Sequence, residues 1–389
     1  MKERTLVSHP PDATPAPSNK PVVSPIYQSV KFTFENVEQV EQYLRGETPG
    51  YIYSRKSNPT VHQLELLLAK LQGCEDAIVT STGVSALATA LLGTLEVGAH
   101  LVLLYDCYCP TRRIVRTFLS RYGVTSTFLA VHDYAGLERA IEQENVRAVM
   151  VESLTNPMLR ILDVERILEL IRGRNITLIC DNTLSGLHSF RQYPIDLYVH
   201  SLTKYASGHG DVLGGAVIGD TKLLNKIRGT TDLGYSLDAN SAFLILRGLK
   251  TYFVRYEKQC EQARAVAQFL SEQKQVKQLF YPGLPSHPDY ALAQTQFSDP
   301  GTLITFDLEG GKAEARQFMN ALKIFNLTFS LGATESIVSP AKLFFSPDLS
   351  ARECDVVGIT DSTIRLSIGL EDLDDLLNDL RGAFATFTT

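Results

Sequence analysis

A lysine that follows a strand-like segment is the first candidate for chemistry. Lys204 closes the run SLTK at 201–204, directly after the strand-like residues 197–200. A buried lysine amine has a lowered pKa and becomes nucleophilic, so it can form a Schiff base with an aldehyde. The hydroxyls of Ser201 and Thr203 could bind a phosphate on the same molecule. A lysine in this position is more often a surface residue, so the hypothesis needs a second group.

A carboxylate follows a neighbouring, very apolar strand-like segment at 176–180. Asp181 could pair with a pyridinium nitrogen, which would keep an aromatic cofactor ring protonated as an electron sink. A loop aspartate more often caps a turn. Ligands of open α/β sheets bind beyond the carboxyl ends of the strands. Asp181 and Lys204, at adjacent strand ends, therefore favour one shared cofactor site more strongly than either residue does alone.

Two further strand ends carry groups that suit a phosphorylated, planar cofactor. Gly83 and Val84 follow strand-like residues 76–81 and begin a helical pattern, whose first N–H groups could bind an anion. An ordinary helix cap explains the same residues. Tyr108 follows strand-like residues 100–105, and its ring could stack on a cofactor ring. A packed loop tyrosine is the ordinary alternative.

The elements that position these groups alternate between apolar strands and helices of roughly ten residues. This alternation predicts an α/β domain with a mostly parallel sheet of about seven strands, buried on both faces. Later strands at 276–281, 302–308 and 363–368 predict a smaller C-terminal α+β domain. We also expect a helix at 111–121 and a long helical region over about 239–272.

These patterns divide the chain into three predicted parts. Residues 1–52 are rich in proline and predict an extended arm without regular elements, which contacts a neighbouring subunit. Residues 53–248 form the predicted cofactor-binding α/β domain. Residues 249–389 form the predicted α+β domain.

Composition and motifs argue against several other classes of protein. The formal net charge of −6 argues against a nucleic-acid-binding protein. No apolar run approaches the ~20 residues of a membrane span, and the start lacks the apolar region of a secretory signal, so a cytoplasmic protein is expected. The eight histidines form no metal-binding motif, so no metal is expected. The glycines at 208–215 precede a strand rather than a helix, which argues against a dinucleotide loop. The six cysteines are predicted to be reduced thiols.

Longer motifs join these residues into a family resemblance. From about residue 21 to 387, the chain resembles the pyridoxal-phosphate enzymes of cysteine and methionine metabolism. The resemblance implies a fold-type I enzyme with a large seven-stranded sheet domain and a smaller C-terminal domain. The motifs that carry it are YSRKSNPT at 53–60, ESLTNP at 152–157, DNT at 181–183, SLTK at 201–204, GHGD at 208–211, YPGLPSHP at 281–288, SLG at 330–332 with ES at 335–336, and RLSIGLE at 365–371.

The resemblance also implies roles for individual residues. Lys204 would hold pyridoxal 5'-phosphate and then act as a general base, Asp181 would pair with the ring nitrogen, and Tyr108 would stack on the ring. These three are the expected catalytic residues. Further contacts to the cofactor are expected from Gly83, Val84, Ser201, Thr203 and Thr183, and from Tyr53 and Arg55 of a neighbouring subunit. Substrate contacts are expected from Arg365 on the α-carboxylate, and from Asn156, Ser330, Arg113 and Glu335.

The same resemblance implies at least a dimer, usually a tetramer, but leaves several reactions open. The sequence YCPT at 108–111 resembles bacterial cystathionine β-lyases, whereas Arg113 and Glu335 match γ-synthases and γ-lyases. Ile52 is apolar where several members that act at the γ-carbon carry glutamate, and SPAKLFF at 339–345 departs from the common pattern. We expect a carbon–sulfur lyase that cleaves cystathionine to homocysteine, pyruvate and ammonia. The alternatives are cystathionine γ-synthase, cystathionine γ-lyase and an inactive binding protein.

Overall fold

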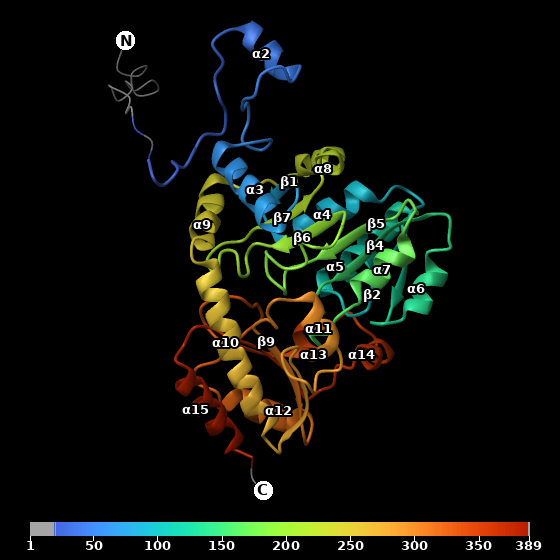
Figure 1. Ribbon diagram of the computed structural model, residues 1–389, viewed down its shortest axis with the longest axis vertical. Helices are drawn as coiled ribbons and strands as arrows, with labels where there is room; N and C mark the ends of the chain where they lie inside the picture. The colour runs from blue at the N-terminus through green and yellow to red at the C-terminus, as the bar shows by residue number, and fades with distance from the viewer. Residues whose placement is uncertain (1–18, 20, 388–389) are drawn as a thin grey trace.

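The computed structural model describes residue 19 and residues 21–387, and its first lobe contains a seven-stranded sheet (Figure 1). The strands lie in the order β1-β7-β6-β5-β4-β2-β3. Strand β7 is antiparallel to its two neighbours, and the other neighbouring pairs are parallel. The predicted, mostly parallel sheet is therefore confirmed. The strands are β1 (Asp76–Thr80), β2 (His100–Leu104), β3 (Thr125–Leu129), β4 (Val146–Glu152), β5 (Thr177–Asp181), β6 (Leu197–Ser201) and β7 (Gly215–Gly219).

Alternate residues of these strands pack into two apolar cores, one on each face of the sheet. In β5, Leu178 and Cys180 belong to one core and Ile179 belongs to the other. Successive side chains of a strand point to opposite faces, so helices cover both faces of this sheet. Helices that contribute to the first core include α3 (Pro59–Gln72), α6 (Tyr134–Ala140), α7 (Val164–Ile171) and α9 (Ala239–Leu249). The helices of the second core are α4 (Gly83–Thr94) and α8 (Thr221–Ile227), with the helical segment 109–122.

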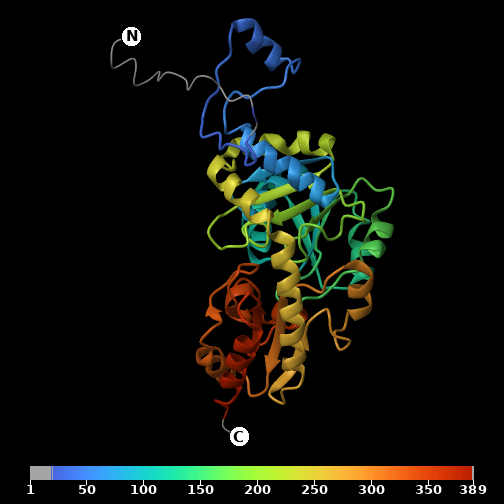
Figure 2. The same cartoon turned by 60° about the vertical axis from the view of Figure 1, so that its left-hand side comes forward.

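A second lobe contains a five-stranded sheet in the order β10-β11-β12-β9-β8. Helix α10 (Tyr252–Ser271) runs from the first lobe along this sheet (Figure 2). A separate apolar core joins α10, α12 (Lys312–Ala321) and α15 (Leu373–Phe384) to the sheet. The strands are β8 (Val276–Phe280), β9 (Leu303–Leu308), β10 (Asn326–Leu327), β11 (Ile337–Pro340) and β12 (Thr363–Ser367). The other helices are α11 (Tyr290–Gln296), α13 (Ala341–Phe345) and α14 (Ala351–Val357). Within the described residues, no helix is both long and apolar enough to cross a bilayer.

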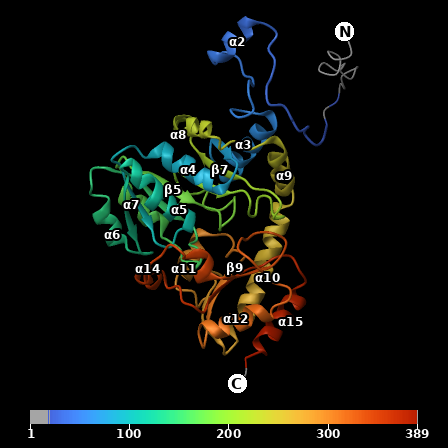
Figure 3. The same cartoon turned by 180° about the vertical axis from the view of Figure 1, so that it is seen from behind.

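The N-terminal arm contains one helix that was not expected. Helix α2 (Val37–Leu44) projects from the first lobe, at the opposite end of the molecule from the second lobe (Figure 3). It begins at Asn36, whose side chain accepts a hydrogen bond from the N–H of Gln39, a favourable helix cap. The predicted arm without regular elements was therefore wrong for residues 37–44, because no proline lies between Pro25 and Pro49. Its first eighteen residues and Lys20 lie outside the described residues.

Two expected helices are interrupted. The region 239–272 forms α9 and α10, which are separated at Lys250 and Thr251. Thr251 leaves the helical conformation (φ −114°, ψ 10°), and its hydroxyl donates to the carbonyl of Gly248, an alternative to the helical pattern. The helix expected at 111–121 begins earlier, as α5 (Cys109–Arg113), and continues as a π-helical turn, η1 (Ile114–Phe118), and a 3₁₀ turn, η2 (Leu119–Tyr122). The limits of the three predicted parts remain predictions.

Candidate active site

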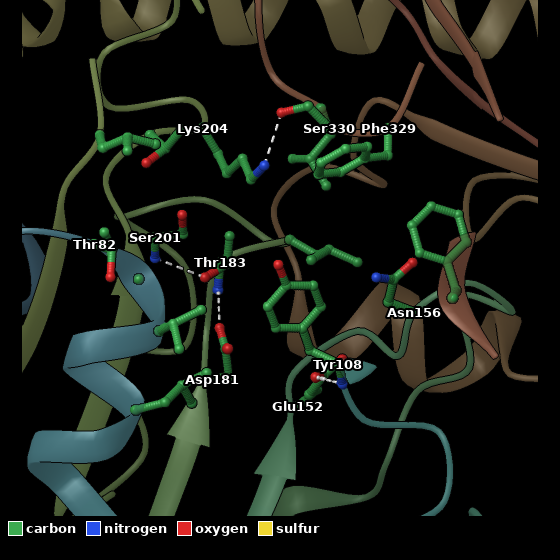
Figure 4. Close-up of a pocket in the computed structure, with 18 of the residues that line it drawn as sticks. Thr82, Tyr108, Glu152, Asn156, Asp181, Thr183, Ser201, Lys204, Phe329 and Ser330 are labelled. Carbon is green, nitrogen blue, oxygen red and sulfur yellow. Dashed lines mark hydrogen bonds between the residues drawn. The ribbon is translucent and has the colours of Figure 1, made fainter. Parts of the chain in front are cut away.

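The carboxyl ends of the first sheet border a cavity of about 490 Å³ that also reaches the second lobe (Figure 4). This volume lies within the usual range for small-molecule sites. The turns after β1, β2, β4, β5 and β6 meet here because these strands point in the same direction. The lining residues are Thr82, Gly83, Val84, Leu87, Tyr108, Glu152, Asn156, Asp181, Thr183, Leu184, Ser201, Thr203, Lys204, Leu213, Phe329, Ser330, Leu331, Phe345 and Arg365.

Lys204 lies in a tight turn after β6, and its amine faces the second lobe. Its backbone N–H donates to the carbonyl of Ser201 (3.2 Å), and Nζ donates to Oγ of Ser330 (2.7 Å). Burial of the amine, together with the positive charge of Arg365, lowers the pKa of Lys204 to about 8. Roughly a tenth of the amine is then unprotonated at pH 7, far more than for an exposed lysine. The structure therefore provides a nucleophilic amine inside the cavity.

Asp181 ends β5 and also lines the cavity. Its Oδ1 accepts a hydrogen bond from the N–H of Thr183 (3.0 Å), and the hydroxyl of Thr183 accepts one from the N–H of Ser201 (2.9 Å). Burial raises the pKa of Asp181, although hydrogen bonds from Thr183 act in the opposite direction. A cationic ring nitrogen would stabilise the ionised form of this carboxylate. The predicted pair of Asp181 and Lys204 thus shares one cavity.

The start of α4 forms the part of the cavity that suits an anion. Thr82 caps this helix, and its hydroxyl accepts a hydrogen bond from the N–H of Ser85 (3.0 Å). A Cβ on Gly83 would lie 2.8 Å from Cβ of Ser201, so only glycine allows this close approach of α4 to the end of β6. The first N–H groups of a helix lack partners within the helix and attract anions. With Ser201 and Thr203, they fit the phosphate of the implied cofactor.

Arg365 projects from β12 and is 1% exposed. Its Nη1 donates to Oδ1 of Asn156 (2.8 Å) and its Nη2 donates to the carbonyl of Ser330 (2.6 Å). Its Nε is buried without a hydrogen-bond partner among the described residues, and its guanidinium lies 4.1 Å from the ring centroid of Phe345. Burial lowers the pKa of Arg365 to about 10, so it stays charged at neutral pH. A buried cation with a free donor fits a substrate carboxylate.

Ser330 has an uncommon backbone conformation for a residue other than glycine. Its φ is 139°, and residues in such conformations cost free energy that the surrounding structure must offset. The same residue accepts hydrogen bonds from Lys204 through its hydroxyl and from Arg365 through its carbonyl. The strained turn thus brings the amine and the guanidinium to the same side of the cavity.

Several lining residues had no expected role, and Glu152 is the most unusual of them. Glu152 ends β4 beside Asp181, and its Oε1 accepts a hydrogen bond from the N–H of Tyr108 (2.5 Å). Its Oε2 has no hydrogen-bond partner among the described residues, and burial raises its pKa well above the usual range. The signal was present, because Glu152 ends an apolar strand as Asp181 does. The apolar residues Leu213, Phe329 and Phe345 also had no assigned role.

Four expected site residues do not line this cavity. Tyr53 is 44% exposed, and Arg55 lies 5.5 Å from the centroid of its ring and 3.5 Å from Oδ1 of Asp232. Glu335 and Arg113 are both exposed and lie outside the lining. The expected contacts of these residues with cofactor or substrate therefore remain predictions.

Replacement of Arg365 with alanine is expected to weaken substrate use. Loss of one partner of a buried charge pair costs about 2–5 kcal/mol, which corresponds to roughly a 30- to several-thousandfold loss of kcat/KM. Steady-state kinetics check this result. Arg381→Ala is a matched control, because Arg381 also lies over a phenylalanine ring, that of Phe269, but not in the cavity. An unchanged kcat/KM for Arg365→Ala would mean that the carboxylate binds elsewhere.

The fold and the cavity together define a class: an α/β enzyme whose lysine amine, acidic partner and anion-binding helix fit a phosphorylated aldehyde cofactor. Residues 5–385 match the family of Cys/Met metabolism PLP-dependent enzymes. The chain belongs to this family, and its cofactor is pyridoxal 5'-phosphate. The predicted family, fold class and cofactor are confirmed.

Named relatives and a solved structure support this assignment. L-methionine gamma-lyase of Fusobacterium nucleatum is 38% identical over 92% of this chain and 91% of the relative. Cystathionine gamma-lyase of Bacillus subtilis is 36% identical, over 98% of each chain. A crystal structure from Campylobacter jejuni, with N'-pyridoxyl-lysine-5'-monophosphate, matches with a TM-score of 0.89 and 31% identity, over 94% of this chain and 95% of that chain. The expectation of a pyridoxal-phosphate-dependent lyase is confirmed at the level of the family. These relatives do not establish that this chain catalyses β-elimination.

Proposed function

We propose that the protein is a carbon–sulfur lyase for L-amino acid thioethers. The expected overall reaction converts the thioether and water to a thiol, a 2-oxo acid and ammonia. The observation that carries this proposal is the placement of Lys204, Asp181 and Arg365 around one cavity. These residues supply a base, a ring-nitrogen partner and a carboxylate-binding cation. The relationship to methionine and cystathionine lyases supports a sulfur-containing substrate.

The reaction we favour is γ-elimination from a short, methionine-like thioether. The lining includes Phe329 and Phe345 from the second lobe and Leu213 from the segment before β7, which suit an apolar end of the substrate. Among the described lining residues, the acidic and basic side chains are Glu152, Asp181, Lys204 and Arg365. The distal ammonium and carboxylate of cystathionine would therefore need partners outside this group. Cleavage of cystathionine at its β-carbon is the second candidate, supported by the YCPT sequence at 108–111.

The roles of the chain's own residues follow from their positions. Bound pyridoxal phosphate supplies an electron sink that makes the α-proton of an amino acid acidic. Arg365 orients the amino acid through its carboxylate, and Nζ of Lys204 removes the proton from Cα and, in γ-elimination, a further proton from Cβ. Burial raises the pKa of Tyr108, so its hydroxyl keeps a proton that it can donate to the departing sulfur.

The proposed active site also includes a neighbouring subunit. Tyr53 and Arg55 lie outside their own cavity but belong to the motif that carried the family resemblance. We infer that they reach the phosphate bound by an adjacent copy, which requires at least a dimer. A tetramer of two such dimers is the assembly implied by the resemblance.

Product analysis of the cofactor-loaded protein tests the function. L-Methionine and L-cystathionine are supplied separately, without an added thiol, and the 2-oxo acid and thiol are identified. Methanethiol with 2-oxobutyrate from methionine is the expected result. Homocysteine with pyruvate from cystathionine alone would favour the β-lyase, and cysteine with 2-oxobutyrate the cystathionine γ-lyase. No product without an added thiol would contradict the lyase and favour γ-replacement, to be checked with cysteine and an acylated homoserine.

A further inference from the structure

We propose that Arg112, bound to Asp348, is a positioning residue for the amino-acid side of the cavity. Arg112 lies in α5, is 1% exposed and does not line the cavity itself. Its guanidinium lies between the two lobes and makes hydrogen bonds to both. The inference rests on the proposed function only in treating the cavity as an amino-acid site.

On the second lobe, the guanidinium binds the last residue of α13 and the segment that follows it. Nε donates to Oδ2 of Asp348 (2.9 Å) and Nη2 donates to Oδ1 (2.7 Å), a bidentate ion pair. Nη2 also donates to the carbonyl of Phe345 (2.7 Å). Bidentate pairs between arginine and a carboxylate are strong and restrict orientation. Arg112 therefore fixes the backbone of the residue whose ring lies over Arg365.

On the first lobe, the same guanidinium binds the turn that leads from β2 to Tyr108. Nη1 donates to the carbonyls of Tyr105 (3.0 Å) and Cys107. Together with the bonds to the second lobe, these contacts give Arg112 five hydrogen bonds, one for each N–H donor of its guanidinium. The side chain of Arg112 thus has one orientation in which all its donors are bonded. This orientation fixes the position of Phe345 relative to the turn that precedes Tyr108.

Tyr108 and Phe345 border the part of the cavity where the amino-acid substrate must be oriented. The ring of Phe345 lies 4.1 Å from the Arg365 guanidinium, which we expect to bind the carboxylate. Tyr108 and Phe345 both line the cavity. Small displacements of substrate-positioning groups lower activity strongly. Arg112 would therefore affect substrate binding through these residues, without touching the substrate.

A matched pair of carboxylate-to-amide variants tests this role. Asp348→Asn weakens the partner of Arg112, whereas Glu353→Gln changes a nearby carboxylate that binds Arg116 (2.7 Å) instead. Each cofactor-loaded variant is titrated with L-norleucine, a methionine-sized amino acid without a leaving group, and the cofactor absorbance is followed. We expect Asp348→Asn to raise the Kd for norleucine about tenfold or more, because it weakens the contact that orients the amino acid. Glu353→Gln leaves that contact intact and should change the Kd less than about twofold. KM for a cleaved thioether should rise with the Kd, while kcat changes less than about threefold.

Two further variants separate positioning from loss of folding. Arg112→Lys keeps the charge but lacks the planar fork, so it should resemble Asp348→Asn. Phe345→Leu should also weaken norleucine binding, and its effect should not add to that of Asp348→Asn, because both act through one contact. Thermal unfolding and the cofactor absorbance report whether each variant is folded and loaded. Wild-type affinity for norleucine in folded Asp348→Asn, or in Phe345→Leu, would overturn the proposal. A wild-type protein that binds norleucine but cleaves no thioether would contradict the proposed function alone.

Discussion

Replacement of Lys204 with alanine is expected to lower turnover by at least about 10³-fold, because general base catalysis alone contributes roughly 10²–10⁴-fold. The same variant should lose the visible absorbance of the lysine-bound cofactor. Nζ of Lys204 lies inside the cavity, 2.7 Å from Oγ of Ser330, and its pKa is lowered to about 8 by burial and by the charge of Arg365. A short, apolar side chain provides neither the nucleophile nor the base.

Absorbance spectra and single-turnover assays check the prediction for Lys204. Lys222→Ala is the control, because Lys222 is exposed on α8 and does not line the cavity. This control should keep both the absorbance and the turnover of the wild type. Retention of the lysine-bound absorbance by a folded Lys204→Ala protein would refute the assignment of Lys204.

Replacement of Asp181 with alanine is expected to slow α-proton removal by roughly 30- to several-thousandfold, which is the equivalent of about 2–5 kcal/mol for a lost buried charge partner. Asp181 lies at the end of β5, and its Oδ1 is held by the N–H of Thr183 at 3.0 Å. Burial raises the pKa of this carboxyl, so the proposed cationic nitrogen is what would keep it ionised. Asp181→Asn should behave similarly, because the amide keeps the shape without the charge.

Exchange of the substrate α-proton with solvent measures this effect directly. Asp196→Asn is a suitable control, because Asp196 accepts a hydrogen bond from the N–H of Leu178 (2.8 Å), near the start of β5 rather than its carboxyl end. Its exchange rate should match that of the wild type. A wild-type exchange rate in Asp181→Ala would show that this carboxylate has no part in the reaction.

The first-lobe residues that line the cavity were largely predictable from the sequence. Lys204, Asp181 and Tyr108 each follow an apolar strand, and parallel strands place such residues at one edge of the sheet. Gly83 was predictable for the same reason, as the start of a helix after a strand. Local pattern and topology therefore sufficed for these groups.

The second-lobe side of the site was harder to predict. Phe345 follows the site lysine by well over a hundred residues, and only the packing of the two lobes brings it over Arg365. Of the neighbouring arginines, the sequence resemblance pointed to Arg113, whereas the structure buries Arg112 between the lobes. Adjacent residues of a helical segment point in different directions, so their roles depend on which face meets the other lobe.

The amino-acid sequence by itself determined the family, the cofactor and the mostly parallel sheet, because hydrophobic periodicity and short motifs are local properties of the chain. Only the tertiary structure decided which side chains of the second lobe complete the cavity. It also decided that Glu335 lies outside the lining, that Glu152 is buried beside Asp181, and that Arg112 joins the lobes. The physical reason is that these contacts join residues far apart in the chain, and their geometry depends on how the two separate cores pack against each other.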